Sequence, residues 1–354
     1  MKKLINDVEH VLTEQLAGLG LAHPKLKIHT DPIYVTRTDA PVANKVALIS
    51  GGGSGHEPMH AGFVGQGMLD GACPGAIFTS PTPDQMYECG SAVDSGEGIL
   101  LIIKNYTGDV LNFETAVELL HGEGRKVGAI LIDDDVAVKD SLYTAGRRGV
   151  ANTVLIEKLL GAASAQGLDL DQLVELGHKL NNNGHSIGIA LGACTVPAAG
   201  KPSFTLAENE MEFGVGIHGE PGIERRTFKN LNDTVDQMFN TLIENGNYQR
   251  TIRIWNRETG EWQEQIQQKT ALQYGNRVIA MVNNLGSVPV SELYGVFARL
   301  QHNCEQFGLR IERTMIGSFC TSLDMQGISI TLLKIDDGDL GLFDAPVKTP
   351  ALHW

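Results

Sequence analysis

The chain has 354 residues, 42% hydrophobic and 20% charged, with 28 Lys and Arg against 42 Asp and Glu, a net charge of −14. This composition excludes wholesale disorder, and at roughly 150 residues per domain the length suggests two domains. So acidic a surface disfavours nucleic acid and anionic membranes as partners. The 41 glycines cluster in short runs after apolar segments, which is typical of an α/β enzyme with tight site loops.

The sequence shows no sign of secretion, membrane insertion or disulfide bonding. The first residues lack the apolar stretch of a secretory signal, and the longest strongly apolar run, 99–103, is too short to span a bilayer. The five cysteines are scattered and include no Cys-x-x-Cys pair, so we expect buried thiols. These features predict a soluble, cytoplasmic protein.

The N-terminal half alternates predicted helices with strands that are apolar throughout. Apolar residues at helical spacing predict an amphipathic helix over 4–19. Strands are predicted at 45–50, 98–104 and 126–132, and residues 150–180 are expected to be helical. Because continuously apolar strands belong to sheets buried on both faces, we expect a layered α/β domain.

The second half has a different pattern and predicts a smaller, mixed α+β domain. Its expected elements are a strand at 187–191, a helix at 230–245, a hairpin at 251–262, a strand at 278–282, a helix at 291–307, and strands at 309–316 and 328–335. We therefore divide the chain into an N-terminal α/β domain, 1–184, and a second domain, 185–335. The tail, about 336–354, is left as a segment that can pack back on the first domain.

The first candidate for chemistry is the glycine-rich stretch Ser50–His60, after the first predicted strand. Its glycines allow backbone N–H groups to approach a ligand closely, but it is neither a Walker loop nor a dinucleotide-binding motif. His56 and His60 form an H-E-x-x-H string, yet Pro58 and the glycines oppose the helix that a zinc site needs. The alternative is a glycine turn with an incidental histidine.

The second candidate is the pair Lys104 and Asp109, at the end of the strand 98–104. Ligands usually bind at the carboxyl ends of strands in α/β sheets. A lysine and an aspartate that face the glycine-rich stretch can hold and deprotonate a hydroxyl. The alternatives are a surface charge at Lys104 and a helix cap at Asp109.

The third candidate is His218, which glycines flank on both sides. Gly214 and Gly216 are expected to leave one face of a strand bare and so to present His218 in open space. A histidine is mostly neutral at pH 7, and its imidazole can act as a nucleophile. A structural histidine is the alternative.

Three successive aspartates, Asp133–Asp135, end the third predicted strand. A Mg²⁺ site would require their carboxylates to converge. Successive side chains in an extended segment point in different directions, so we favour a solvated strand end.

Together these stretches resemble the K subunit of dihydroxyacetone kinases, from about residue 4 to the C-terminus. The resemblance is carried by Gly-Gly-Gly-Ser-Gly-His-Glu-Pro (51–58), Ile-Lys-Asn-Tyr-Thr-Gly-Asp (103–109), Ala-Gly-Arg-Arg-Gly (145–149), Leu-Gly-Ala-Cys-Thr-Val-Pro (191–197) and Gly-Ile-His-Gly-Glu-Pro-Gly (216–222). Single-chain, ATP-dependent members continue into a nucleotide-binding helical barrel. The resemblance therefore implies the phosphoenolpyruvate-phosphotransferase form, in which an ADP-carrying L subunit, recharged by a phosphohistidine-bearing M subunit, supplies the phosphoryl group.

The resemblance also implies roles for individual residues. His218 would add to the carbonyl carbon of dihydroxyacetone and form a covalent hemiaminal. Asp109 would be the base near the attacking hydroxyl, and His56 its acid/base partner. The implied substrate-binding residues are Gly53, Ser54, Gly55, His56, Lys104 and Asp109.

No cofactor or metal is expected on this chain, because ADP or ATP and Mg²⁺ are expected on the L subunit. The expected partners are dihydroxyacetone, the L subunit, indirectly the M subunit, and a second copy in a homodimer. A hypothesis from another class is a non-catalytic sensor or carrier of small carbonyl compounds. Such a protein would keep the His218 adduct without needing Asp109.

Overall fold

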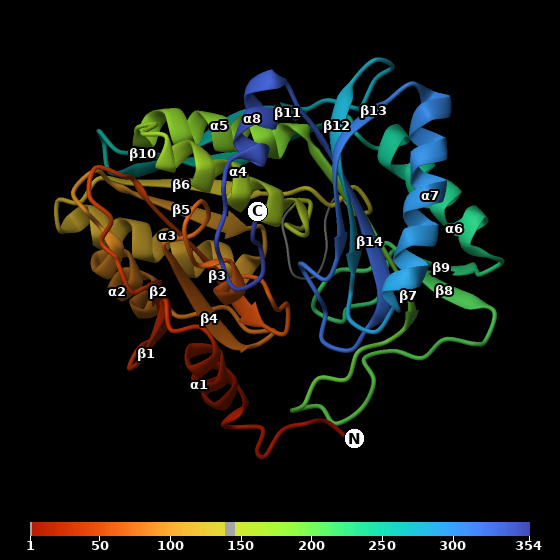
Figure 1. Ribbon diagram of the computed structural model, residues 1–354, viewed down its shortest axis with the longest axis horizontal. Helices are drawn as coiled ribbons and strands as arrows, with labels where there is room; N and C mark the ends of the chain where they lie inside the picture. Colours follow the sequence, from red (N-terminus) through yellow and green to blue (C-terminus); the bar gives the residue numbers. More distant parts are fainter. Residues whose placement is uncertain (1, 139–145) are drawn as a thin grey trace.

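The computed structural model describes residues 2–138 and 146–354, which form two six-stranded sheets and a separate hairpin (Figure 1). The first sheet has the order β1-β2-β4-β3-β5-β6. Its strands are β1 (Leu26–Thr30), β2 (Ile33–Arg37), β3 (Ala47–Ser54), β4 (Gly71–Ile77), β5 (Ile99–Lys104) and β6 (Val127–Ile132). Strands β4, β3, β5 and β6 are parallel, so the segments that follow them meet at one edge of the sheet.

The second sheet has the order β13-β12-β14-β7-β8-β9 and is mostly antiparallel; only β12 and β13 run parallel. Its strands are β7 (Gly184–Gly192), β8 (Glu210–Phe213), β9 (Glu224–Thr227), β12 (Arg277–Asn284), β13 (Arg310–Gly317) and β14 (Gln326–Lys334). The helices of the chain are α1 (Val11–Ala22), the short 3₁₀ helix η1 (Ala61–Phe63), α2 (Pro83–Val93), α3 (Thr107–Gly122), α4 (Asn152–Ala165), α5 (Leu170–Asn183), α6 (Leu231–Glu244), α7 (Val290–Phe307) and α8 (Asp337–Asp344).

Helices cover both faces of the first sheet. Leu100 and Ile102 of β5 pack in one core with α4 and α5, whereas Leu101 and Ile103 pack in another with α2 and α3. This alternation explains why the strand is apolar at every position. The predicted combination of a layered α/β part and a mixed α+β part is confirmed.

Helix α4 lies between the two sheets (Figure 1). Every residue from Asn152 to Ser164 is buried. The core around α4 contains Ile102 of the first sheet and Met281 of the second. The sheets therefore share one helical layer, while α6 and α7 cover the far face of the second sheet.

The predicted hairpin is confirmed and consists of β10 (Tyr248–Asn256) and β11 (Glu261–Lys269). It packs on the N-terminal half, near β6 and α5 (Figure 1). Trp255 of β10 shares a hydrophobic core with Phe113 of α3.

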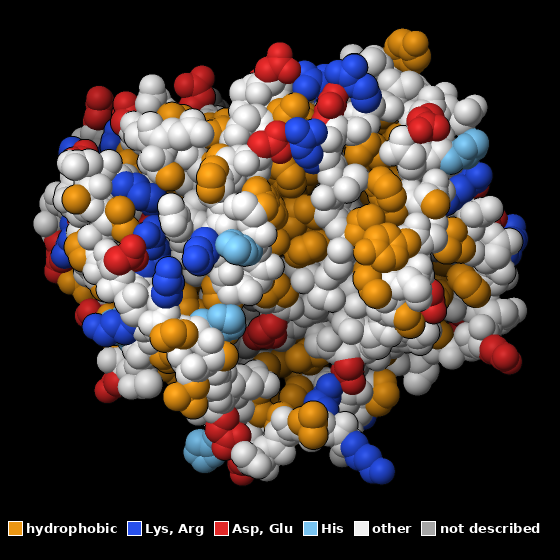
Figure 2. All heavy atoms as spheres, viewed as in Figure 1, with side chains coloured by type: hydrophobic (Ala, Val, Ile, Leu, Met, Phe, Trp, Pro, Cys, Tyr) orange, Lys and Arg blue, Asp and Glu red, His pale blue; other side chains and the backbone are white. Residues whose placement is uncertain are grey.

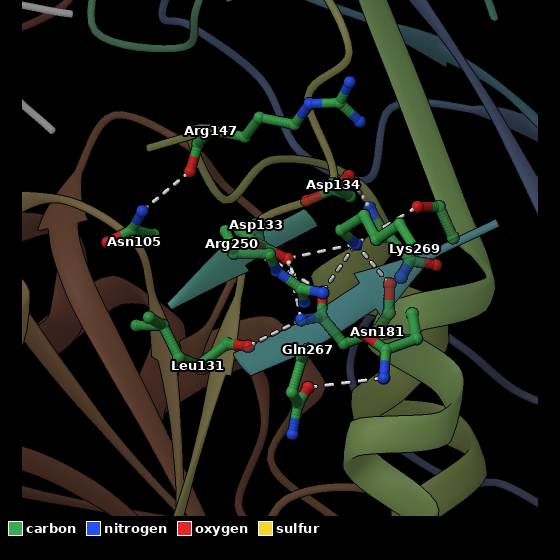
Figure 3. A network of polar contacts seen from close by, with 12 residues as sticks. Asn105, Leu131, Asp133, Asp134, Arg147, Asn181, Arg250, Gln267 and Lys269 are labelled. Carbon is green, nitrogen blue, oxygen red and sulfur yellow. Dashed lines mark hydrogen bonds and ion pairs between the residues drawn. The ribbon is translucent and has the colours of Figure 1, made fainter. Parts of the chain in front are cut away.

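The favoured interpretation of Asp133–Asp135 as a solvated strand end is wrong, because all three are buried. Asp133 lies in the network of Figure 3, with Arg250 Nε at 2.6 Å and Lys269 Nζ at 3.0 Å. Burial would raise the pKa of Asp133, but Lys269 and Arg250 outweigh it and lower that pKa below its ordinary value. These ion pairs thus join both strands of the hairpin, through Arg250 and Lys269, to the residue that follows β6.

The other two aspartates have different partners. Asp134 accepts hydrogen bonds from the N–H groups of Val150, at 2.7 Å, and Asn152, at 2.9 Å. Asp135 accepts a hydrogen bond from Arg148 Nε at 2.7 Å. The three carboxylates therefore do not converge, and within the described residues no group of His, Cys, Asp and Glu could hold a metal ion.

The chain returns to its N-terminal half after α8. The N–H of Lys348 donates to the carbonyl of Gln66 at 2.8 Å, and that of Ala351 to the carbonyl of Gly62 at 3.0 Å.

On the face of the molecule drawn in Figure 2, acidic side chains are spread across the surface and do not gather in one patch. Across the described ranges, every helix is too short or too polar to traverse a bilayer.

The sequence did not predict β1, β2, β4, α2, β8, β9 or α8. The first predicted strand, 45–50, also ends four residues before β3 does. Strand β3 continues to Ser54, with Gly51 paired to Cys73 and Gly53 to Gly75 of β4. A Cβ at Gly51 would lie 2.5 Å from the Cys73 carbonyl oxygen. Glycine here permits close packing within the sheet and does not begin a loop.

We expect Asp133→Asn to lower the free energy of unfolding by about 3–5 kcal/mol, because Arg250 and Lys269 would keep buried charges without a counter-ion. Urea denaturation measures the loss. The control is Asp236→Asn, which breaks a partly exposed pair with Arg299 and should cost about 0–1 kcal/mol. Equal losses in the two variants would contradict this account.

Candidate active site

Two histidines from opposite halves of the chain meet at the carboxyl edge of the first sheet. His56 follows β3, His218 lies after β8, and their Nε2 atoms are 3.2 Å apart. His56 Nδ1 lies 2.8 Å from the carbonyl oxygen of Thr321. Because a carbonyl only accepts, Nδ1 of His56 carries the proton, and its Nε2 accepts from the Nε2–H of His218.

Aromatic rings surround the half-buried imidazole of His218. Ring centroids of Tyr106 and Phe78 lie 4.3 and 5.3 Å from it, both nearly edge-on. Burial, together with the charges of Lys104 and Arg148, lowers the pKa of His218 to about 3. Burial also lowers the pKa of His56 well below its usual value. Both imidazoles are therefore neutral near pH 7.

Buried Glu220 anchors the loop that carries His218. Its Oε2 accepts the backbone N–H of His218 at 2.8 Å, and its Oε1 lies 3.2 Å from Arg148 Nη1. Nη2 of Arg148 donates to the carbonyl of Gly214 at 2.7 Å. One buried arginine thus holds the chain on both sides of His218, at Gly214 and at Glu220.

The expectation that Gly214 and Gly216 leave a strand face bare is wrong. Both residues lie beyond β8, and Gly214 has a φ of +75°. A Cβ at Gly216 would lie 1.6 Å from Glu220 Oε1 and 2.7 Å from Arg148 Nη1. The absent side chain makes room for this ion pair.

Lys104 and Asp109 lie at the end of β5 and in the first turn of α3. Nζ of Lys104 is 3.7 Å from Asp109 Oδ2 and donates to the carbonyl of Gly51 at 2.8 Å. Both side chains are buried, which contradicts the alternative of a surface charge at Lys104. Burial raises the pKa of Asp109, opposed by Lys104 and by a hydrogen bond with Ser80.

A cleft of about 600 Å³ joins His218 to Asp109. Residues after β4, residues at the start of α3 and residues of the second half line it, among them Phe78, Ser80, Tyr106, Asp109, Ser203 and His218. Two of the three proposed catalytic residues therefore face the same space. The third, His56, is buried and contacts His218.

The predicted binding residues Gly53, Ser54 and Gly55 do not line this cleft. Gly53 and Ser54 belong to β3 and line a second cavity, of about 590 Å³, beside α1. Ser54 Oγ donates to the carbonyl of Gly75 at 2.7 Å. Gly55 lies against Phe78, whose Cε1 a Cβ would approach to 2.8 Å.

The H-E-x-x-H string brings His56 and His60 to different partners. His60 Nε2 is 2.8 Å from Lys104 Nζ, and its Nδ1 is 2.5 Å from Glu157 Oε1 of α4. Glu157 is not among the site residues predicted from the sequence. The available signal was the charged pair Glu157-Lys158 inside an otherwise apolar run, Val154–Leu160.

Comparison with known proteins identifies the family. The family model described as the Dak1 domain matches residues 17–351. The chain belongs to the Dak1 family. This Dak1 chain is 72% identical over 354 residues to the PEP-dependent dihydroxyacetone kinase, dihydroxyacetone-binding subunit DhaK of Escherichia coli (strain K12), covering 100% of this chain and 99% of that protein. The predicted relationship to K subunits of the phosphotransferase-dependent form is confirmed.

Two solved structures resemble this Dak1 chain closely. The dihydroxyacetone kinase of C. freundii superposes with a TM-score of 0.83 at 32% identity, covering 99% of this chain and 60% of that one. The dihydroxyacetone kinase operon co-activator Dha-DhaQ superposes with a TM-score of 0.84 at 32% identity, covering 96% and 97%. The same fold thus occurs in a kinase and in a co-activator.

We expect the imidazole of His218 to remain neutral from pH 8 down to pH 5, because its pKa is about 3. In Glu220→Ala the loop loses its anchor, and the ring should titrate nearer its ordinary pKa of about 6.5. Histidine NMR signals followed against pH measure both. The exposed Glu224→Ala is the control and should leave the signal unchanged; titration of His218 near pH 6.5 in the unsubstituted protein would refute the assignment.

Proposed function

We propose that this chain is the dihydroxyacetone-binding subunit of a phosphoenolpyruvate-phosphotransferase-dependent dihydroxyacetone kinase of the cytoplasm. It binds dihydroxyacetone covalently and presents a hydroxyl for phosphorylation to dihydroxyacetone phosphate. The observation that carries the proposal is the contact of two neutral histidines, His56 and His218, beside a cleft that also holds Asp109. The names of the relatives supply the substrate class.

The geometry supports a nucleophilic addition of the His218 imidazole to the ketone, with His56 relaying the proton. Nε2 of His218 forms a bond to the ketone carbon while its proton passes to Nε2 of His56, 3.2 Å away. The π electrons of the carbonyl move to its oxygen, which takes the proton from His56. The Nδ1–H of His56, held on Thr321, stabilises the charge that passes through this ring. The product is a neutral hemiaminal.

Covalent anchoring suits a substrate of this kind. Dihydroxyacetone is too small to bury much apolar surface, so noncovalent contacts alone give limited affinity. The addition also requires a carbonyl, which glycerol lacks. The aromatic rings of Phe78 and Tyr106 keep the reacting imidazole in place.

Asp109 is the group proposed to accept the proton of the attacking hydroxyl. Phosphoryl transfer proceeds through a loose transition state, so positioning and charge contribute more than a strong base. Burial raises the pKa of Asp109 and so makes this carboxylate a better base, while Lys104 favours the ionised form.

The phosphoryl donor is proposed to come from an L-type subunit that carries ADP or ATP with Mg²⁺ and is recharged by a phosphohistidine-bearing M-type subunit. The sequence of this chain has no Walker motif, which is consistent with a nucleotide held by a partner. A homodimer is proposed on the family resemblance, and sedimentation equilibrium tests it.

The second candidate function is a sensor or carrier of small carbonyl compounds. The co-activator Dha-DhaQ, with a TM-score of 0.84, is the observation that favours it. A sensor needs the adduct on His218 but not a base, so Asp109 separates the two candidates.

In the first test, His218→Ala should lose the mass increment of one dihydroxyacetone that native mass spectrometry is expected to show on the unsubstituted protein. The exposed His302→Ala is a matched control and should keep the increment. An adduct that persists in His218→Ala would rule out this nucleophile.

In the second test, Asp109→Asn should keep the adduct and lose at least about 100-fold in phosphorylation rate, the usual scale for a general base. The assay combines this chain with L-type and M-type partners and a phosphoenolpyruvate-driven donor. Undiminished turnover in Asp109→Asn would favour the sensor. Turnover by the unsubstituted chain with ATP alone would contradict the division into subunits.

A further inference from the structure

A line of buried polar groups leads from the centre of the molecule to the proposed base. Oε1 of Glu157 lies 2.5 Å from His60 Nδ1, and His60 Nε2 lies 2.8 Å from Lys104 Nζ. Nζ of Lys104 in turn lies 3.7 Å from Asp109 Oδ2. Glu157 and Lys104 are fully buried, and His60 is 6% exposed. Neither Glu157 nor His60 has a part in the chemistry described above.

The donors and acceptors along this line fix the positions of the protons. A lysine ammonium has no lone pair, so it donates and His60 Nε2 accepts. The proton of the neutral His60 ring then lies on Nδ1 and is donated to Glu157 Oε1. Burial lowers the pKa of His60 well below its usual value and raises that of Glu157 to about 8. Near pH 7, therefore, Glu157 acts mainly as an uncharged acceptor.

The ammonium of Lys104 is consequently held on two sides. One N–H donates to the carbonyl of Gly51 and one to His60. The third is left for the side of Asp109, where 3.7 Å exceeds a hydrogen bond and allows contact with a substrate oxygen. The other ionisable groups that interact electrostatically with these residues are His56, which acts on His60, and His218 and Cys320, on which Lys104 acts.

We propose that Glu157 and His60 are positioning residues for phosphoryl transfer, which hold Lys104 beside Asp109 by fixing the tautomer of the His60 ring. The inference rests on the proposed function. Without the acceptor at residue 157, the His60 ring is free to place its proton on Nε2, facing the ammonium. Lys104 then has to leave this position, and Asp109 loses its nearest cation.

The test compares Glu157→Leu, Glu157→Gln and the unsubstituted chain in the reconstituted assay. Without its cation, the Asp109 carboxylate is harder to ionise, so the acid limb of the kcat profile should move by about one unit to higher pH in Glu157→Leu. At pH values well below the limb this corresponds to an approximately tenfold loss of kcat, whereas above the limb kcat should return towards the unsubstituted value. Glu157→Gln keeps a carbonyl acceptor and should behave like the unsubstituted chain.

Two controls separate positioning from a general structural effect. Glu114→Leu removes another buried carboxylate, which pairs with Arg253, and should not move the acid limb. The adduct on His218 should persist in all three variants. The inference would be overturned if the acid limb of the kcat profile did not move in Glu157→Leu, or if it moved by the same amount in Glu157→Gln.

A measurement on the unsubstituted chain makes the test independent of how the variants fold. ¹⁵N NMR of the His60 ring should show a protonated Nδ1 and an unprotonated Nε2, and the opposite tautomer would overturn the inference. If the unsubstituted chain forms no adduct and transfers no phosphoryl group, the proposed function itself fails, whatever the tautomer of His60.

Discussion

The buried ammonium of Lys104 is the constraint around which the site is built. A buried ammonium costs several kcal/mol unless other groups pair with it and satisfy its N–H groups. Its partners come from β3 at Gly51, from the following segment at His60, and from α3 at Asp109. Residue 52 has to be a glycine here, because a Cβ at this position would lie 2.3 Å from Lys104 Nζ. The glycine-rich strand thus accommodates a cation within the protein.

The two halves of the chain contribute different parts of the site. The first sheet supplies the charged groups, because four parallel strands end at one edge. The second half supplies a neutral imidazole on a loop that Glu220 and Arg148 hold in place. Thr321 of the second half also fixes the tautomer of His56, a residue of the first half. Each half therefore sets the protonation of a group on the other.

Much of the fold could be predicted from local pattern. The apolar run at 98–104, the hairpin around Thr259 and the helix near 291–307 are confirmed within a few residues. The three residues that the resemblance singled out, His56, Asp109 and His218, lie in or beside one cleft. Their sequence motifs carried this information, because each motif ends a strand or forms a tight turn.

The errors arise where distant residues decide the environment. Asp133 is buried because Arg250 and Lys269 reach it from a hairpin more than one hundred residues away. No local pattern around Asp133 reveals those cations. Likewise, His60 seemed incidental because its partners Lys104 and Glu157 lie on other elements. Strands β1 and β2 were missed because they have only five residues each and are partly polar, and β4 because glycine and proline interrupt its apolar pattern.

The shared position of helix α4 limits how the cleft can open. A clamshell rotation of one sheet against the other would pull this helix away from one of them and expose apolar surface along its whole length. Admission of a three-carbon ketone therefore has to come from small displacements at the rim, where Ser203 and Pro221 border the cavity. On this account the side chains behind that rim keep their positions when the ketone enters.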